Sequence, residues 1–425
     1  MKARAQRGGF LLAPQEGGGG RRGALAALAV VGVILVLTLW PLAPRYGAEG
    51  GRFSLRFGLA DAVRNVILFV PLGIILAARG TRATGIALRA AALSAAIEVA
   101  QTQIPGRYGN ATDVASNVAG ALLGAALLSS SSRWLWPGRR GATRLGVAWS
   151  AVVAAALLGT GALFAPSLPR TEYYAGWTLD LAHLDHYTGR VSSAHLGAEP
   201  LPNGRLGRSD LVRRLWLDGA PLRVEAVAGE RAESLAPIFS IHDDVHREVV
   251  LLGAERGDLV LRVRTLAQAV SLDRPAIRWA GALDGARAGD PLALGARREG
   301  NGWCLSLGDR SACPLGFSAG SGWRLVWFPQ SLPPAAGPWL NAAWLAALFV
   351  PLGLWLRASI VSAAAIAAAA LALLATPLAG LLPPPPAEIG AAAAGIALGA
   401  ALRALLASRA SGERLAAATR GALPL

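Results

Sequence analysis

Long apolar runs separated by short basic stretches dominate this chain. Each run is long enough to cross about 30 Å of hydrocarbon as a helix of roughly 20 residues. The eight runs lie at residues 24–42, 62–78, 86–104, 113–130, 146–165, 338–356, 359–382 and 387–407. The pattern therefore predicts an α-helical polytopic membrane bundle of about eight transmembrane helices.

Between the fifth and sixth runs, at residues 167–336, short segments alternate apolar and polar positions. Strand candidates lie at 222–227, 236–242, 248–253, 258–265, 303–307 and 323–328. Turn residues separate them, with hairpin turns expected at 242–244 and 255–258. Many short strands in one block predict an all-β sandwich.

Composition supports five regions along the 425 residues, of which 53% are hydrophobic. We expect a disordered, basic cytoplasmic tail, a five-helix membrane domain, the sandwich, a three-helix membrane segment and a second cytoplasmic tail. Their expected bounds are 1–23, 24–166, 167–336, 337–407 and 408–425. The first helix is expected to remain uncleaved, because no convincing signal-peptide cleavage site follows it.

Charge predicts how the chain crosses the membrane. The block at 167–336 contains 19 basic and 19 acidic residues, so the net charge of +15 belongs to the rest of the chain. There the arginines cluster in alternate loops, which by the positive-inside rule makes the expected sandwich extracytoplasmic and both termini cytoplasmic. Because topology explains the basic pI, the expected partner is a lipid bilayer and not nucleic acid.

A motif within the apolar runs occurs twice. The sequence FVPLG stands at 69–73 and again at 349–353, an offset of 280. Residues 119–127 (AGALLGAAL) resemble residues 394–402 (AGIALGAAL) at an offset of 275. Two matches in the same order predict that spans six to eight duplicate spans two to four as a parallel repeat.

Spans two to four, the first copy of the repeat, contain or adjoin pairs of polar residues. The two residues of a pair are three or four positions apart, so they share one helix face. The candidate site residues are Asp61 and Asn65, Glu98 and Gln101, Asp113 and Asn117, with Arg107 in a loop. Carboxylates in a bilayer are costly, which favours a functional site near the outer face. The alternative is an ion-paired clasp that only holds three helices together.

The second copy is poorer in such residues. Glu388 lies seven positions before Gly395, as Asp113 lies before Gly120, and Asn341 corresponds loosely to Asn65. The other polar residues have no counterpart. The sequence thus predicts one polar site, in the first copy.

Residues 24–130 resemble the VanZ-like membrane protein family. The resemblance is carried by Asp61, Asn65, 69–73, Glu98, Gln101, Arg107, Asp113, Asn117, Gly120 and Gly124. The founding member is associated with low-level resistance to teicoplanin-type glycopeptides. The resemblance implies a bacterial cell-envelope protein whose partner is a glycan, a lipid-linked wall precursor or a glycopeptide, but it supplies no reaction.

Two alternatives remain open for the membrane part. An intramembrane enzyme acting on lipid-linked precursors would use Glu98 or Asp113 as acid or base, although the spans contain no histidine or cysteine. A transporter would suit the repeat. Whether the chain is an enzyme stays open, and no cofactor is expected.

The segments 237–242, 249–252 and 258–264 are similar to laminin-G/concanavalin A-like lectin domains, which implies an outer binding module. Trp177, Trp216 and Trp279 fit sugar stacking or core packing, and core packing is the preferred interpretation.

Two further groups of residues in the block bear on chemistry. Cys304 and Cys313 predict a disulfide across a hairpin with its turn at 308–309, because they are the two cysteines of a block expected outside. The histidines and Asp243–Asp244 lack a full ligand set, so no metal site is expected.

Overall fold

The computed structural model describes residues 19–40, 53–55, 57–104, 109–181, 184–273, 275–327 and 335–421. The chain divides into two compact units, residues 1–142 and 143–425. Residues 1–18, most of the expected N-terminal tail, lie outside the described ranges, and helix α1 begins at Gly19.

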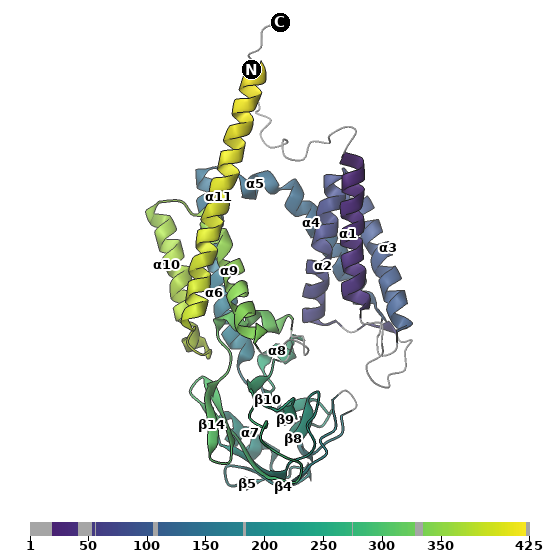
Figure 1. Ribbon diagram of the computed structural model, residues 1–425, viewed down its shortest axis with the longest axis vertical. Coiled ribbons are helices and arrows are strands. Elements are labelled where there is room, and N and C mark those ends of the chain that lie inside the picture. Colours follow the sequence, from purple (N-terminus) through teal and green to yellow (C-terminus); the bar gives the residue numbers. More distant parts are fainter. Residues whose placement is uncertain are drawn as a thin grey trace. The chain divides into compact units, whose positions relative to one another are not determined.

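The N-terminal unit is helical (Figure 1). Its elements are α1 (Gly19–Leu39), β1 (Phe53–Ser54), α2 (Leu59–Ala78), α3 (Ala83–Thr102), β2 (Gly109–Asn110), α4 (Ala111–Ser129), α5 (Ser131–Leu135) and the start of α6 (Arg139–Phe164). Its core combines apolar side chains of α1, α2, α3 and α4, including Ile34, Phe69, Ile86 and Ala121.

The C-terminal unit contains the remainder of α6, a β domain and a second group of helices. These helices are α9 (Ala336–Trp355), α10 (Ile360–Leu374) and α11 (Pro386–Gly421), with a short 3₁₀ turn η2 (Thr376–Ala379) between α10 and α11. Side chains of α6, α9, α10 and α11 form one core with Leu157, Phe349, Ala369 and Ala392.

Within the described ranges, six helices are long and apolar enough to cross a membrane, namely α2, α3, α4, α6, α9 and α11. The apolar helices at 23–39 and 360–374 are shorter. The prediction of a helical membrane bundle is therefore confirmed. Helix α10 ends earlier than expected, because Pro377 lacks the N–H of a continuing helix and a 3₁₀ turn replaces it.

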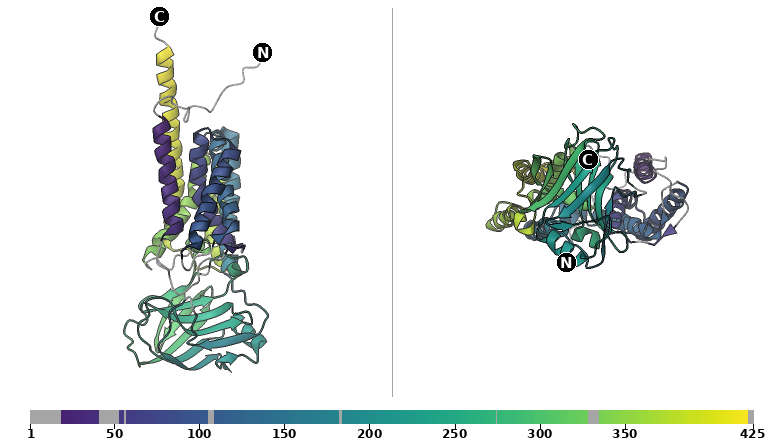
Figure 2. Two further views of the ribbon diagram at one scale, coloured as in Figure 1. Left: turned by 90° about the vertical axis from the view of Figure 1, so that its right-hand side faces the viewer. Right: turned by 90° about the horizontal axis from the view of Figure 1, so that it is seen from below.

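The β domain consists of two antiparallel six-stranded sheets, which confirms the predicted all-β sandwich (Figure 2). One sheet has the order β11-β10-β9-β8-β3-β6. Its strands are β3 (Tyr173–Trp177), β6 (Gly204–Arg205), β8 (Ala236–Asp243), β9 (Glu248–Glu255), β10 (Asp258–Val263) and β11 (Ile277–Trp279).

The other sheet has the order β14-β13-β12-β7-β4-β5. Its strands are β4 (Arg190–Leu196), β5 (Glu199–Pro200), β7 (Leu222–Val227), β12 (Pro291–Glu299), β13 (Gly302–Leu307) and β14 (Arg310–Leu315). Two short helices, α7 (Ser209–Leu217) and α8 (Leu266–Ala269), lie within the same stretch of chain. Strand β7 alternates buried and exposed residues, so its buried side faces the core between the sheets.

The core contains side chains of both sheets, such as Phe239, Leu252 and Leu294. Trp216 is buried in it, and Trp177 and Trp279 pack against it. These contacts confirm core packing for the three tryptophans.

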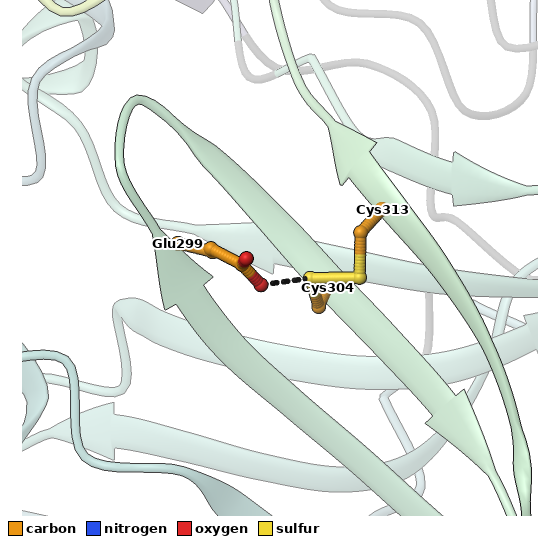
Figure 3. A group of neighbouring side chains, drawn as sticks. All are labelled: Glu299, Cys304 and Cys313. Carbon is orange, nitrogen blue, oxygen red and sulfur yellow. Dashed lines mark hydrogen bonds between the residues drawn. A yellow bond between two sulfur atoms is a disulfide. The ribbon is translucent and has the colours of Figure 1, made fainter.

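The expected disulfide is present between Cys304 and Cys313 (Figure 3). It joins β13 to β14 across the predicted turn at 308–309. A carboxylate oxygen of Glu299 lies 2.8 Å from Cys304 Sγ, and these three residues are close enough together to suggest metal ligands. Both sulfurs belong to the disulfide, so they are not thiolate ligands.

One strand prediction is wrong. Residues 319–325, part of which overlaps the expected strand at 323–328, form a 3₁₀ helix η1 (Ala319–Leu325). The segment leaves the sandwich and packs against α9, and glycines at 320 and 322 let it approach the helices closely. Residue 328 lies outside the described ranges.

Helices α2 and α4 pack at three glycines, each of which faces a backbone carbonyl of the other helix. A Cβ atom would lie 1.8 Å from Ala121 O at Gly73, 2.2 Å from Val66 O at Gly120, and 2.1 Å from Val70 O at Gly124. No larger residue fits these three positions without moving the helices apart.

Helices α9 and α11 repeat this arrangement residue for residue. A Cβ atom would lie 1.9 Å from Ile396 O at Gly353, 2.3 Å from Ala346 O at Gly395, and 2.0 Å from Val350 O at Gly399. Each of these contacts is obtained from its N-terminal equivalent by adding 280 to the residue number on α2 and 275 to the residue number on α4. The same offsets that relate the two sequence motifs therefore relate two helix pairs of equal geometry.

Candidate functional site

The acidic side chains of the N-terminal unit gather in one place. Asp61, Glu98 and Asp113 are the three acidic residues that the sequence contains between positions 50 and 171. Both Asp61 and Glu98 interact electrostatically with Asp113. Three carboxylates from three different helices thus form one cluster.

The packing of the helices explains why these residues meet. The glycine contacts hold α2 and α4 together, and Asp61 and Asp113 both lie in the first turn of their helix. Carboxylates are favourable there because they interact with the positive end of the helix dipole. Glu98 lies in the last part of α3, and it reaches the same cluster.

Asn110 links two of the carboxylates. It pairs with Ser54 in the short parallel β1–β2 ladder, and it is the N-cap of α4. Its backbone N–H donates to Glu98 Oε2 at 2.7 Å, and its side-chain Nδ2 donates to Asp113 Oδ1 at 3.2 Å. The short strand β2 therefore connects the end of α3 to the start of α4 through the hydrogen bonds of Asn110.

Burial differs among the three acids. Glu98 is 3% exposed, whereas Asp113 is half-buried. Asn65 donates a side-chain hydrogen bond to Asp113. The side chain of Asp61 is 58% exposed and its Oδ1 accepts from Arg64 at 2.5 Å. The cluster therefore has a buried end at Glu98 and an accessible end at Asp61 and Arg64.

Such a cluster offers carboxylate acceptors beside one guanidinium donor. Charged acceptors form stronger hydrogen bonds than neutral ones. The accessible end can therefore bind a polar group that presents several N–H or O–H donors. The described residues include no histidine or cysteine near it, so any proton transfer would depend on the carboxylates.

The remaining candidate residues do not join this cluster through any contact in the described part of the chain. Gln101 donates from Nε2 to the Thr38 carbonyl of α1 at 3.0 Å. Asn117 is buried and donates to Ser94 Oγ at 2.8 Å. Both amides tie neighbouring helices together, as in a structural clasp. Arg107 lies outside the described residues.

Sequence reasoning gave too little weight to Arg64 and Asn110. Arg64 lies one helical turn from Asp61, a spacing that predicts an i,i+3 ion pair. Asn110 stands directly before an apolar run with a helix start, which is a typical N-cap position. Neither signal reveals that Asn110 donates to Glu98 of α3, or that the charge of Arg64 acts on Asp113 of α4.

A second buried carboxylate lies in the C-terminal unit. Glu388, in the first turn of α11, is 2% exposed. It accepts hydrogen bonds from the Ser318 hydroxyl, from Gly320 N at 3.0 Å and from Asn341 Nδ2 at 3.2 Å. The offset of 275 makes Glu388 the equivalent of Asp113. The offset of 280 pairs Asn341 with Asp61 and not, as the sequence suggested, with Asn65.

The sandwich has a hollow on one sheet. Its volume is about 460 Å³, and it lies over β7, β12, β13 and β14. The polar side chains that line it are Arg223, Glu225, Arg297, Ser306 and Ser311.

Asp243, considered as a calcium ligand, has local partners instead. Its Oδ1 accepts from Val245 N at 3.2 Å and Arg247 N at 2.8 Å, and its Oδ2 accepts from Arg247 Nε at 2.8 Å. Burial alone would raise the pKa of Asp243, but these hydrogen bonds and the positive charge of Arg247 lower it below its usual value. Asp243 therefore shapes the hairpin between β8 and β9.

Comparison with known proteins gives one match, to part of the chain. Residues 27–134 match the model of a family described as VanZ/LLP1, and no family match names the sandwich. No curated protein matches the chain. No solved structure matches it either. The match spans 108 of the 425 residues and includes every residue of the acidic cluster.

Proposed function

We propose that this chain is a multi-pass cell-envelope protein whose VanZ-like unit binds a polar ligand at the cluster of Asp61, Glu98 and Asp113. The observation that carries the proposal is the convergence of all three acidic side chains of residues 50–171 at one end of three helices. A purely structural clasp would be expected to bury its charges and pair them between helices. Here Asp61 remains 58% exposed, and its partner Arg64 belongs to the same helix.

The family match supports the identity of the ligand. The VanZ-like resemblance implies a glycan, a lipid-linked wall precursor or a glycopeptide, and the match at 27–134 covers the cluster. We therefore expect the chain to alter susceptibility to teicoplanin-type glycopeptides by binding such a molecule. The alternation of arginine clusters supports cytoplasmic termini and an extracytoplasmic sandwich.

The hollow on the sandwich supports a second binding role, for glycans. Its arginine, glutamate and serine side chains offer the donors and acceptors that sugar hydroxyls require. A glycan array probed with the purified full chain tests this role. We expect binding that Arg223→Ala weakens, and the absence of binding to every glycan would contradict it.

The main proposal is tested in a glycopeptide-sensitive bacterium that expresses the chain. Asp113→Asn and Glu98→Gln keep the shape of each side chain but remove its charge. We expect both variants to lose the change in susceptibility while the amount in the membrane and the thermal stability in detergent stay close to those of the original protein.

Asp244→Asn provides the control, because Asp244 is an exposed acid in the hairpin between β8 and β9. It should retain the full effect on susceptibility. If Asp113→Asn and Glu98→Gln instead collapse expression, the cluster is a clasp. If they leave susceptibility and stability unchanged, the cluster has no role in binding.

A further inference from the structure

The chain itself fills the polar site of the C-terminal helix pair. Residues 318–321 leave the sandwich and lie against Asn341 of α9 and Glu388 of α11. The close fit requires a glycine at 320, where a Cβ atom would lie 2.4 Å from Glu388 Oε1 and 2.7 Å from Asn341 Cβ. This segment is therefore built to approach the two polar residues.

The donors that the segment presents are of two kinds. The Ser318 hydroxyl donates to one oxygen of Glu388, and the backbone N–H of Gly320 donates to the other at 3.0 Å. The Ser321 hydroxyl accepts from Asn341 Nδ2 at 3.5 Å, and Asn341 Oδ1 accepts from Trp323 Nε1 at 2.9 Å. A hydroxyl group and a secondary amide N–H thus occupy the site together.

The N-terminal helix pair has the same scaffold with an accessible site. The glycine register makes Asp61 and Asp113 the equivalents of Asn341 and Glu388. Glu388 is 2% exposed under its occupant, whereas its equivalent Asp113 is half-buried. Asn341 is partly buried, whereas the side chain of its equivalent Asp61 is 58% exposed. Among the described residues, Asp61 accepts a hydrogen bond from Arg64 alone, and only through Oδ1.

From this comparison we infer that the segment 318–321 is a built-in occupant of the C-terminal copy, and that the N-terminal copy binds a ligand with the same donors. In the C-terminal copy both donors go to Glu388. In the N-terminal copy a second carboxylate, Asp61, stands in the place of Asn341, and the ligand presents its hydroxyl and neighbouring secondary amide N–H to Asp61 and Asp113. This inference rests on the proposed function and specifies which chemical group enters the site. N-acylated amino sugars and serine-containing peptides both carry that group.

The two sources are distinguished by binding measurements on the full chain in detergent or nanodiscs. The probes are N-acetylglucosamine, with glucose as its control, and the peptide acetyl-Ser-Ala-Gly-Ser-amide, with acetyl-Ala-Ala-Gly-Ala-amide as its control. We expect at least one probe to bind and its control, which lacks the amide or the hydroxyls, to bind much more weakly. Failure of both probes to bind would overturn the inference.

Variants of the full chain show where the probe binds. Asp61→Asn is suited to this purpose because the side chain is largely exposed and its loss should not disturb packing. Replacing a charged acceptor by a neutral one should weaken binding about tenfold, whereas Asp244→Asn should leave it unchanged. Binding that is lost in Arg223→Ala but kept in Asp61→Asn would place the probe on the sandwich and contradict the inference.

The occupant has its own test. Ser318→Ala removes the hydroxyl that donates to the buried carboxylate of Glu388, so it should lower the thermal stability of the full chain. Ser311→Ala, at an exposed serine on β14, should not lower it. Equal stability of the two variants would contradict the inference that residues 318–321 occupy the C-terminal polar site. If Asp113→Asn abolishes the susceptibility phenotype but neither probe binds, the inference fails and the proposed function stands.

Discussion

Replacing Gly73 with alanine tests the helix packing on which the acidic cluster depends. The new methyl carbon would lie 1.8 Å from the carbonyl oxygen of Ala121 in α4. Ordinary contacts begin at 3.4 Å, so the helices would have to separate by 1.6 Å, the difference between these distances. A backbone carbonyl cannot rotate out of the way as a side chain can.

The cost of this separation can be estimated. Overpacking typically costs about 1–3 kcal/mol, and the upper end applies where the obstacle is backbone. A gap of roughly 0.5–1 Å also loses a quarter to a half of each dispersion contact along the interface. Against this, alanine favours the helix over glycine by about 1 kcal/mol. We expect a net loss of about 2 kcal/mol or more in the free energy of unfolding.

The assay is unfolding of the purified protein in mixed detergent micelles. Gly32→Ala in α1 is the control, because no heavy atom lies within 4 Å of a Cβ placed there. It should leave the stability unchanged or raise it slightly. Gly353→Ala should cost about as much as Gly73→Ala, since its Cβ would lie 1.9 Å from Ile396 O. Equal stability of Gly73→Ala and Gly32→Ala would refute the packing argument.

Two further predictions concern the sandwich. Because the pKa of Asp243 is lower in the folded chain, its carboxylate stabilises the fold at neutral pH and this contribution disappears as the pH falls. Asp243→Asn should therefore lower the melting temperature at pH 7, with a difference that shrinks below about pH 4; a constant difference would contradict this. Reducing the bond between Cys304 and Cys313, which are 9 positions apart, should cost about 2–3 kcal/mol of unfolding free energy. Thermal melts with and without reductant, with thiol alkylation as the check, would reveal no change if the bond did not form.

The fold was largely predictable because both periodicities are strong. Apolar runs located the eight apolar helices found in the described ranges, and alternation located β7, β8, β9, β10 and β13. The exceptions have local causes. Residues 323–325 have the apolar and aromatic composition of a strand, but they belong to the η1 segment, which packs against α9. Tertiary packing determines their conformation, and the pattern of apolar residues in the sequence does not reveal that packing.

The candidate site was predicted in part. Helical spacing predicts that each polar pair shares one face, but it does not say which neighbour each residue meets. Asp61, Asn65, Glu98 and Asp113 meet in the cluster. Gln101 instead contacts α1, and Asn117 contacts α3. Two residues of one pair can therefore meet different neighbours, which their spacing does not reveal.

The matching glycine contacts of the two helix pairs give this difference a physical meaning. A carboxylate at the first turn of the second helix is present in both copies, and burying it without partners would be costly. In the C-terminal copy that cost is offset by three donors, two of which come from the chain's own segment at 318–320. In the N-terminal copy the positions equivalent to Asn341 and Glu388 are Asp61 and Asp113, so two charges are present there, and Asp61 faces solvent beside Arg64. The same scaffold thus holds one carboxylate that packing explains, Glu388, and one pair of carboxylates of which Asp61 stays accessible. A ligand can enter at Asp61.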